Sequence, residues 1–209
     1  MRRWLQYGGF AAGAVLIVFG VVAIAMGVNG RSTVRDNLRQ EQIVGSADMT
    51  PAGIAAEAKA AGLKNVALPT CSVAGKSVAT GAAARCFASY MRIHALEASG
   101  GQTYSQMARF ASADGKGTND KAAASKGSSG QPLDNPARNV WISETALSTA
   151  LNVSYMADQL ALFGVVVGIA LLLSGIGFIV LAAFGMLQLA IPRTRPVVPA
   201  APSTSPATA

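Results

Sequence analysis

Two cysteines and one histidine are the side chains of this sequence that most readily do chemistry. Cys71, Cys86 and His94 are the only residues of their types among 209. A bond between the cysteines would close a short loop, and a loop of this length stabilises a fold by about 3 kcal/mol. The pair lacks the C-x-x-C spacing of a redox motif. The sequence therefore predicts a structural disulfide between Cys71 and Cys86.

His94 has several interpretations. A zinc site of Cys71, Cys86, His94 and a carboxylate is one alternative, although its spacing matches no standard zinc pattern. A hydrogen-bonded core histidine is the simpler interpretation, and an imidazole that titrates near neutral pH leaves a pH-sensing role open. With one histidine and no G-x-S-x-G, P-loop or Rossmann fingerprint, we expect no catalytic residue, no metal and no cofactor. The prediction is that the protein is not an enzyme.

Two aromatic residues are candidate contacts for a ligand or a partner, together with His94. Tyr155 is expected near a membrane–water boundary, where aromatic side chains anchor well. Trp141 would lie further out, and packing against an outer domain is its simpler interpretation. A partner contact is the alternative.

These residues belong to a chain with unusually few charges. Charged residues make up 13% of the sequence, against about 25% in soluble domains. Two uncharged runs, 8–28 and 159–192, account for the deficit, and each is long enough to cross a bilayer as a helix. We therefore predict an all-α membrane protein with transmembrane helices at 8–28 and 161–190. A cleaved signal peptide is the alternative for the first run, which exceeds the usual length of such segments.

Arginines outside the two runs predict the orientation. Arg2 and Arg3 precede the first run, and Arg193 and Arg195 follow the second. Positively charged flanks stay in the cytoplasm. Residues 1–7 and a disordered tail at 191–209 are therefore expected on the cytoplasmic side of the plasma membrane. Residues 29–160 are then extracytoplasmic. Their charge is too dilute for a nucleic-acid footprint.

Small residues recur every seven positions along each predicted membrane helix. They let two backbones approach closely, which is how helices associate inside a bilayer. The sequence predicts that the two helices pack on each other, and a face left free for a partner subunit is the alternative. The predicted packing residues are Gly13, Gly20, Gly27, Gly164, Gly168, Gly175 and Ala182.

The segment 29–160 is predicted to be an α-helical domain. Helices are expected at 31–44, from Thr50-Pro51 to Gly62, and from Thr80 to about Ala98, with a short helical turn at 104–110. A Gly-rich mobile loop at 111–135 follows. The last helix begins at Pro136 and enters the membrane without a break, so that 136–160 forms an outward stalk.

Apolar residues at alternating steps of three and four are typical of a helix with one apolar face. The helix that ends near residue 98 has such a face at Ala83, Cys86, Phe87, Tyr90, Met91, His94 and Ala98. A continuous pattern of the same steps runs from the stalk into the second membrane helix and indicates one unbroken helix. Its residues are Ile142, Ala146, Thr149, Val153, Met156, Leu160 and Phe163.

Several segments resemble a known group of proteins. They are DMTPAGI, ALPTC, YMRIHALEASGG, QTYSQMARF and ARNVWISETALSTALNVSYMADQLALF. These look like small actinobacterial two-span membrane proteins of uncharacterised function, which often carry the automatic label of aromatic ring-opening dioxygenase. Non-haem iron enzymes of that kind need two histidines and a carboxylate, and one histidine cannot supply that set. The resemblance therefore implies an envelope context and no reaction.

The function expected from the sequence is that of a non-catalytic accessory, scaffold or assembly subunit of a cell-envelope complex. Its partners would be the lipid bilayer and either another membrane protein or a second copy. The alternative is an extracytoplasmic sensor or binding protein for an envelope lipid or a small molecule.

Overall fold

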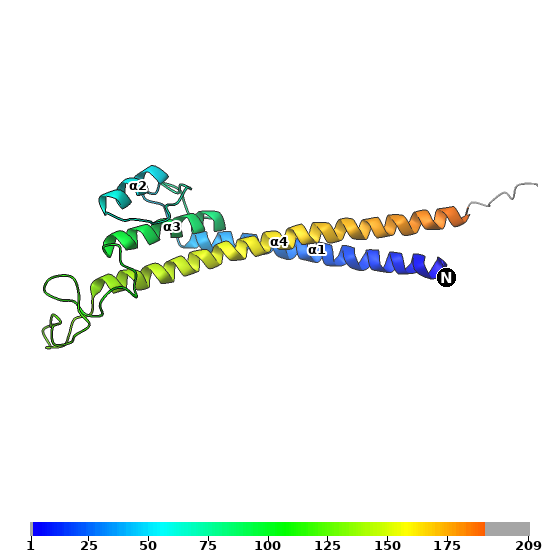
Figure 1. The fold of residues 1–209 in the computed structure, drawn as a ribbon. Helices are drawn as coiled ribbons and strands as arrows, with labels where there is room; N and C mark the ends of the chain where they lie inside the picture. The colour runs from blue at the N-terminus through cyan, green and yellow to red at the C-terminus, as the bar shows by residue number, and fades with distance from the viewer. Residues whose placement is uncertain (1, 191–209) are drawn as a thin grey trace, which may run out of the picture. The chain divides into compact units, whose positions relative to one another are not determined.

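The regular elements of the protein are helices. The computed structural model describes residues 2–190, in which α1 is Arg2–Gln40, α2 is Pro51–Ala60, α3 is Gly81–Ala98 and α4 is Pro136–Ala190 (Figure 1). Over these residues no strand forms, and β-type pairing is confined to isolated bridges such as Val44 with Ser77. The predicted all-α class is confirmed. The predicted tail, 191–209, lies outside the described residues.

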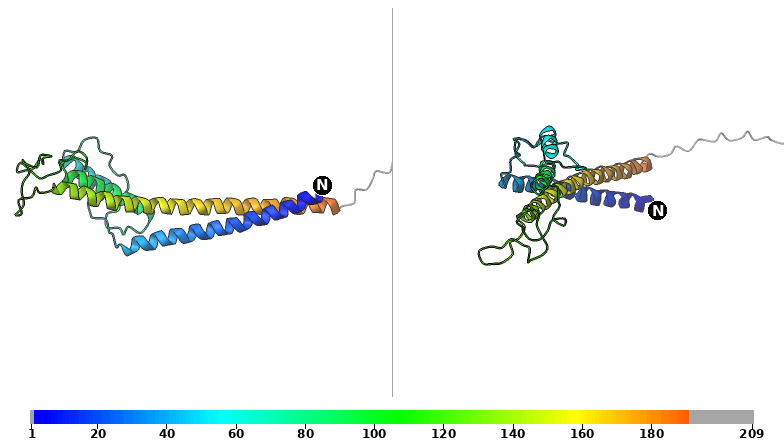
Figure 2. Two further views of the ribbon diagram at one scale, coloured as in Figure 1. Left: turned by 90° about the horizontal axis from the view of Figure 1, so that it is seen from below. Right: turned by 60° about the vertical axis from the view of Figure 1, so that its left-hand side comes forward.

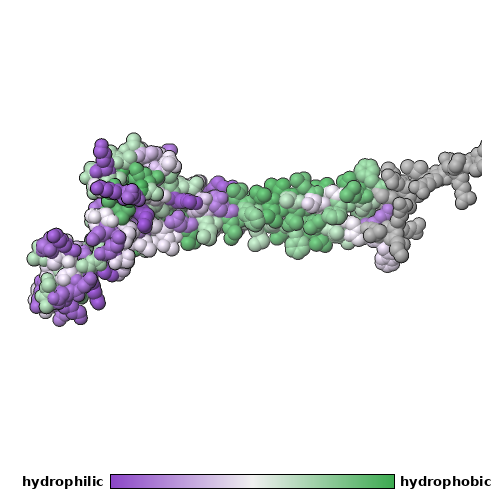
Figure 3. All heavy atoms as spheres, in the orientation of Figure 1, coloured by the Kyte–Doolittle hydropathy of each residue, from purple (hydrophilic) through white to green (hydrophobic). Residues whose placement is uncertain are grey.

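α1 and α4 contain the two long apolar stretches. Gln6–Gln40 and Pro136–Phe184 are each long and apolar enough to cross a membrane. Large apolar side chains on both helices face outward, with Phe19 63% and Leu181 71% exposed. Figure 3 shows hydrophobic residues gathered over these helices and hydrophilic ones over much of the domain formed by the middle of the chain. Because an exposed apolar surface of this extent is rare on soluble monomers, it favours a membrane location.

The chain divides into two compact units. One contains residues up to Val21 and from Ile169 onward, so it holds the beginning of α1 and the end of α4. The other is Val22–Gly168 and contains the rest of both helices, α2, α3 and the connecting loops.

The helix ends follow the chemistry of local residues. Thr50 and Thr80 cap α2 and α3, where their hydroxyls accept hydrogen bonds from Gly53 N and Ala83 N at 3.0 and 3.2 Å. Gly62, with φ of 68°, ends the turn after α2. These bounds are as predicted. The helix expected at 31–44 is the end of α1, but it stops at Gln40 because Gln42 takes the left-handed conformation, with φ of 51°.

The segment between α3 and α4 is irregular. The helical turn predicted at 104–110 is reduced to a turn at 104–106, where Gln106 Oε1 accepts hydrogen bonds from the backbone and the hydroxyl of Thr103. Phe110 instead pairs with Thr118 and Asp134 in isolated bridges. The Gly-rich loop has no helix, as predicted, and backbone hydrogen bonds such as Ser125 N to Ala111 O tie it together.

α3 is the central helix of the unit Val22–Gly168. It lies between α2 and the first part of α4, and it runs antiparallel to α4 (Figures 1 and 2). Of the single apolar face predicted for it, Cys86, Phe87 and Tyr90 are buried. Ala83, Met91 and His94 are only half-buried and Ala98 is exposed, because the buried residues surround the helix. A helix covered on two sides has no single buried stripe. Its buried residues are Gly81, Ala84, Cys86, Phe87, Ala88, Tyr90, Ile93, Ala95 and Leu96.

Candidate functional site

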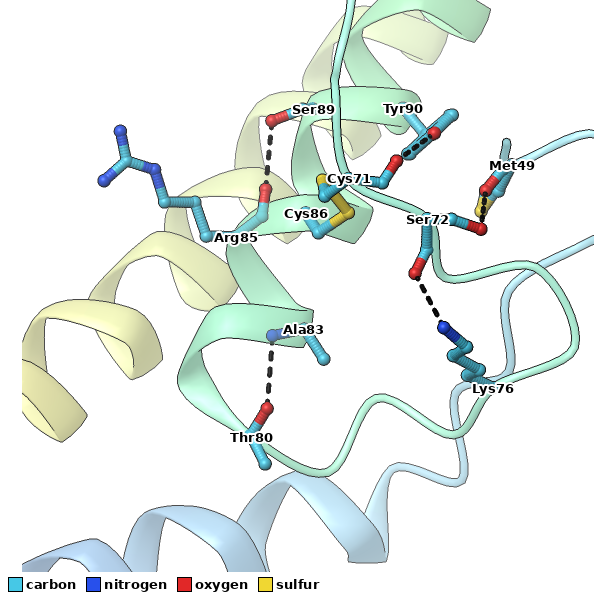
Figure 4. The surroundings of a disulfide bond; sticks show 10 residues. All are labelled: Met49, Cys71, Ser72, Lys76, Thr80, Ala83, Arg85, Cys86, Ser89 and Tyr90. Carbon is cyan, nitrogen blue, oxygen red and sulfur yellow. Dashed lines mark hydrogen bonds between the residues drawn. A yellow bond between two sulfur atoms is a disulfide. The ribbon is translucent and has the colours of Figure 1, made fainter. Parts of the chain in front are cut away.

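The predicted disulfide is present. Cys71 and Cys86 are bonded, with their Cα atoms 6.1 Å apart, and the bond joins the segment before α3 to α3 itself (Figure 4). Tyr90, one turn further along α3, donates a hydrogen bond from its hydroxyl to the carbonyl oxygen of Cys71. Burial raises the pKa of this fully buried tyrosine, and the charge of Asp48 raises it further. The segment at Cys71 is thus fixed to α3 at two points.

The segment fixed by the disulfide also positions the loop before α2. Val73 N and the Ser72 hydroxyl donate hydrogen bonds to Met49 O, at 3.2 and 3.3 Å. Met49 is 4% exposed and precedes the cap of α2. Asp48, its neighbour, is therefore held beside α3 by contacts that begin at the cysteines.

His94 lies between two carboxylates. Its Nε2 atom is 2.9 Å from Asp48 Oδ2 and 3.5 Å from Glu57 Oε2. The three side chains come from the loop before α2, from α2 and from α3, and their ligating atoms lie within 4.8 Å of one another. Asp48 has a pKa below its ordinary value, chiefly because the Ser46 hydroxyl hydrogen-bonds the carboxylate, and His94 contributes to the same direction.

The environment of His94 differs from both predicted ones, a core histidine and a zinc site with Cys71 and Cys86. The imidazole is 31% exposed, so it is not a core histidine. The thiols of the alternative zinc site are unavailable because both sulfurs are in the disulfide. Asp48 and Glu57 were not recognised from the sequence, since only the packing of α2 on α3 brings them to His94.

Trp141 and Tyr155 lie in different surroundings from His94. The indole Nε1 of Trp141 donates to the Ser99 hydroxyl at 3.0 Å and to Gln102 O at 2.9 Å, in a site where Trp141 is 3% exposed. Tyr155 lies beneath the guanidinium of Arg85, 4.7 Å from the ring centroid. Trp141 is therefore packed inside the domain, as its simpler interpretation predicted. The structure does not bring His94, Trp141 and Tyr155, the three predicted contact residues, into one site.

A hollow between α3 and α4 borders His94. It has a volume of about 540 Å³, and its walls include Met91, Val140 and the carboxylate-bearing Glu144. Glu144 is 5% exposed and accepts a hydrogen bond from the Ser148 hydroxyl at 2.8 Å. This hollow could hold a small ligand beside His94.

The glycines of α1 and α4 lie where the two helices touch. In the unit that contains the beginning of α1 and the end of α4, a Cβ on Gly13 would lie 2.7 Å from Gly175 O. In the same unit, a Cβ on Gly9 would lie 3.3 Å from Ala182 Cβ. In the other unit, a Cβ on Gly27 would lie 2.6 Å from Ala161 O. The contacts of Gly13 and Gly27 leave no room for a side chain, and that of Gly9 is tight.

The remaining predicted glycines have related environments. Gly20 and Gly168 are buried. Gly164 is half-buried, and a Cβ there would make ordinary contact with Ala23 O at 3.8 Å. These positions support packing between α1 and α4 rather than a glycine face left free for a partner.

The apolar residues that continue the 4/3 pattern along α4 lie at its surface. Ile142, Val153, Met156, Leu160 and Phe163 are between 55% and 69% exposed. The buried face carries Trp141, Leu151 and the acidic residues Glu144 and Asp158. The pattern predicted one unbroken helix, and α4 is one. Glu144 and Asp158 can occupy the inner face because a hydrogen bond from Ser148 and an ion pair with Arg31 satisfy them there.

Comparisons with protein-family models, with curated proteins and with solved structures find no match to this chain. The resemblance to actinobacterial two-span proteins stays a prediction.

Proposed function

We propose that the protein is a non-catalytic membrane subunit that serves as a scaffold or assembly factor of a cell-envelope complex. The observation that carries this proposal is the exposed apolar stripe of α4, defined as Ile142, Ala146, Thr149, Val153, Met156, Leu160 and Phe163. All seven residues are exposed, in a domain that has a buried core of its own.

The proposed topology puts both termini in the cytoplasm and residues 29–160 outside. Arg2 and Arg3 before the first span, and Arg193 and Arg195 after the second, support it through the positive-inside rule. The disulfide supports it as well, because disulfides persist in oxidising compartments outside the cytoplasm.

In this topology, lipid covers only part of the stripe. Leu160 and Phe163 lie at the proposed start of the membrane segment, whereas Ile142 and Val153 lie outside it, with 55% and 56% of their surface exposed. The steps of four and three give a repeat of 3.5 residues, which is the pattern of a helix that packs along another helix. The outer half of the stripe therefore fits a protein partner.

A second copy of the chain is the partner that fits best. Two copies with the same topology present the stripe at the same depth and in the same direction. The positions that flank it are uncharged (Ser143, Thr145, Ala150, Asn152, Ala157 and Gln159). Identical parallel helices would therefore meet without repulsion between like charges.

Cysteine cross-linking in native membranes tests this proposal. Val153→Cys and Ile142→Cys should each yield a disulfide-linked species of twice the mass under mild oxidation. Leu147→Cys is the matched control, since it is 41% exposed on the same helix but points away from the stripe. Equal cross-linking at all three positions, or none at any, contradicts self-association. A cross-link to a different protein would show that the partner of the stripe is another subunit and not a second copy of the chain.

The proposed topology has its own test. The cysteine of a Ser128→Cys variant, in the loop between α3 and α4, should react with a membrane-impermeant thiol reagent on intact cells. The cysteine of a Ser203→Cys variant should not. The reverse pattern would contradict the proposed orientation.

The hollow beside His94 favours a second candidate function, an extracytoplasmic sensor or carrier for an envelope lipid or small molecule. Its mixed lining of Met91, Val140, Ser143 and Glu144 suits an amphipathic ligand. A lipid that co-purifies with wild-type protein and is lost from Val140→Trp would support this function. Retention of the lipid by that variant would contradict a site in the hollow.

A further inference from the structure

We propose that Asp48, Glu57 and His94 form a binding site for a divalent transition-metal ion, with Zn²⁺ as the ion that suits it best. This site goes beyond the proposed scaffold function and does not depend on it. The starting observation is that one imidazole nitrogen and two carboxylate oxygens, from three separate parts of the chain, lie within 4.8 Å of one another.

The separations suit one small ion. Ligand atoms at about 2.0–2.2 Å from a tetrahedral ion lie about 3.3–3.6 Å from each other. His94 Nε2 is 2.9 Å from Asp48 Oδ2 and 3.5 Å from Glu57 Oε2. Both distances from the imidazole nitrogen are within a few tenths of an ångström of this range, and the carboxylate oxygens lie within 4.8 Å of each other, so small rotations of the side chains would seat a metal ion.

The orientation of His94 also favours a metal over a simple hydrogen bond. Its Nε2 atom is buried from solvent, yet among the described residues it has no hydrogen-bond partner of acceptable geometry. With Asp48 Oδ2 only 2.9 Å away, the failure is one of direction rather than distance. A metal ion would occupy the direction of the nitrogen lone pair, in which the Asp48 carboxylate does not lie.

The donor set selects the class of ion. Imidazole together with carboxylate oxygen suits Zn²⁺ and its neighbours in the first transition series, whereas Mg²⁺ and Ca²⁺ take oxygen ligands. The three side chains are 28–35% exposed, so an ion could enter from solvent and complete its coordination with water.

The surrounding structure holds the three ligands in place. Thr50 N donates to Asp48 O at 2.6 Å, and the Thr50 hydroxyl caps the helix that carries Glu57. His94 is on α3, and the residues on either side of it, Ile93 and Ala95, are buried. A bound ion would therefore join the loop before α2, α2 and α3, next to the disulfide-bonded segment.

The competing explanation is an ion pair in which a protonated His94 bridges the two carboxylates without a metal. Isothermal titration of Zn²⁺ into full-length, detergent-solubilised protein distinguishes the two, provided that the protein carries a tag without histidine. We expect one equivalent to bind. Glu57→Gln and His94→Gln should each weaken binding by at least about tenfold, since even changes outside the ligand shell cost about 10- to 100-fold.

Glu97→Gln is the matched control, because Glu97 is an exposed carboxylate on the same helix as His94. It should bind Zn²⁺ as the wild type does. Co²⁺, used as a spectroscopic probe, should give visible ligand-field bands in the wild type and in Glu97→Gln, and these bands should be lost in His94→Gln. The thermal unfolding curve of each metal-free variant verifies that it is folded.

Three outcomes overturn the proposal. One is the absence of Zn²⁺ binding at millimolar concentration, another is binding that all the variants retain, and the third is binding that Glu97→Gln weakens as much as Glu57→Gln does. None of them bears on the cross-linking of α4, so failure of the metal site and failure of the scaffold function are separate results.

Discussion

Arg31 and Asp158 form an ion pair between α1 and α4, with Arg31 Nε 3.0 Å from Asp158 Oδ1. Asp158 is 5% exposed, and the first residue of α3, Gly81, packs against it so closely that a Cβ there would lie 2.7 Å from Asp158 Cβ. One carboxylate therefore joins the two long helices and the start of α3.

A double-mutant cycle measures the strength of this pair. Asp158→Asn should lower the free energy of unfolding by about 1–3 kcal/mol, because it removes a charged, largely buried acceptor. The exposed pair Arg39–Asp36, at 3.3 Å with both side chains more than half exposed, is the control and should contribute about 0–1 kcal/mol. Equal coupling energies from the two cycles, measured by thermal unfolding in detergent, would contradict the role given to Asp158.

Gly175→Ala should destabilise the helix pair, because the added methyl group would lie 2.7 Å from Gly13 O and 2.9 Å from Ile17 N. We expect a loss of about 1–3 kcal/mol, typical of overpacking. Gly177→Ala is the matched control: a Cβ at Gly177 meets no atom within 4 Å. Thermal unfolding compares the two variants, and similar midpoints for both would show that close packing at Gly175 is unimportant.

Trp141→Phe should remove the indole donor and leave the Ser99 hydroxyl and Gln102 O without it. Loss of a buried donor costs about 1–3 kcal/mol, so the domain should unfold at a lower denaturant concentration. Trp4→Phe is the control, since Trp4 is 83% exposed and lies in the other unit. An unchanged midpoint for Trp141→Phe would contradict the importance of these hydrogen bonds.

Cys86→Ser should lower stability by about 2–5 kcal/mol, as is typical for loss of a native disulfide. Cys71→Ser and the double variant should show the same loss, because all three remove one bond. Free thiols in the denatured, unreduced wild type would contradict the pairing. An additional loss in the double variant would show that a free cysteine contributes to stability in another way.

The stability of the metal-free protein should depend on Asp48 at acid pH. The pKa of Asp48 in the folded protein lies below its ordinary value of 3.8, chiefly through the Ser46 hydroxyl. Its contribution is therefore fully present above the ordinary pKa and is lost as the pH falls through the lower, folded value. The difference in unfolding temperature between wild type and Asp48→Asn should shrink below about pH 4.

Two variants check the cause of this dependence. Ser46→Ala should reduce it, because the hydroxyl is the largest influence that lowers the pKa. Glu41→Gln, which changes an exposed carboxylate, should leave it unaltered. A difference between wild type and Asp48→Asn that does not vary with pH would contradict the lowered pKa.

Features set by neighbouring residues could be predicted from the sequence. Thr50 was recognised as a helix cap, and the next helix was predicted to begin near Thr80, because a capping hydroxyl acts within three residues of its own position. The continuity of α4 followed from the lack of any helix breaker after Pro136. The disulfide followed from the presence of two cysteines in a segment expected to be exported.

Features that depend on distant contacts could not be predicted. The apolar stripe of α4 predicted a continuous helix but not its exposure, because periodicity shows that a helix has two faces, not which of them meets the rest of the protein. Glu144 and Asp158 occupy the inner face because Ser148 and Arg31 provide hydrogen bonds there. The neighbours of His94 depend in the same way on how α2 packs on α3.

The contact between Gly13 and Gly175 has a consequence for biosynthesis. Gly13 emerges from the ribosome at the start of translation, but Gly175 follows only after the whole intervening domain has been made. During that interval the glycine face of α1 lacks its intramolecular partner. The α4 of a neighbouring nascent chain has the same complementary surface, so we expect high expression levels to promote exchange of helices between copies.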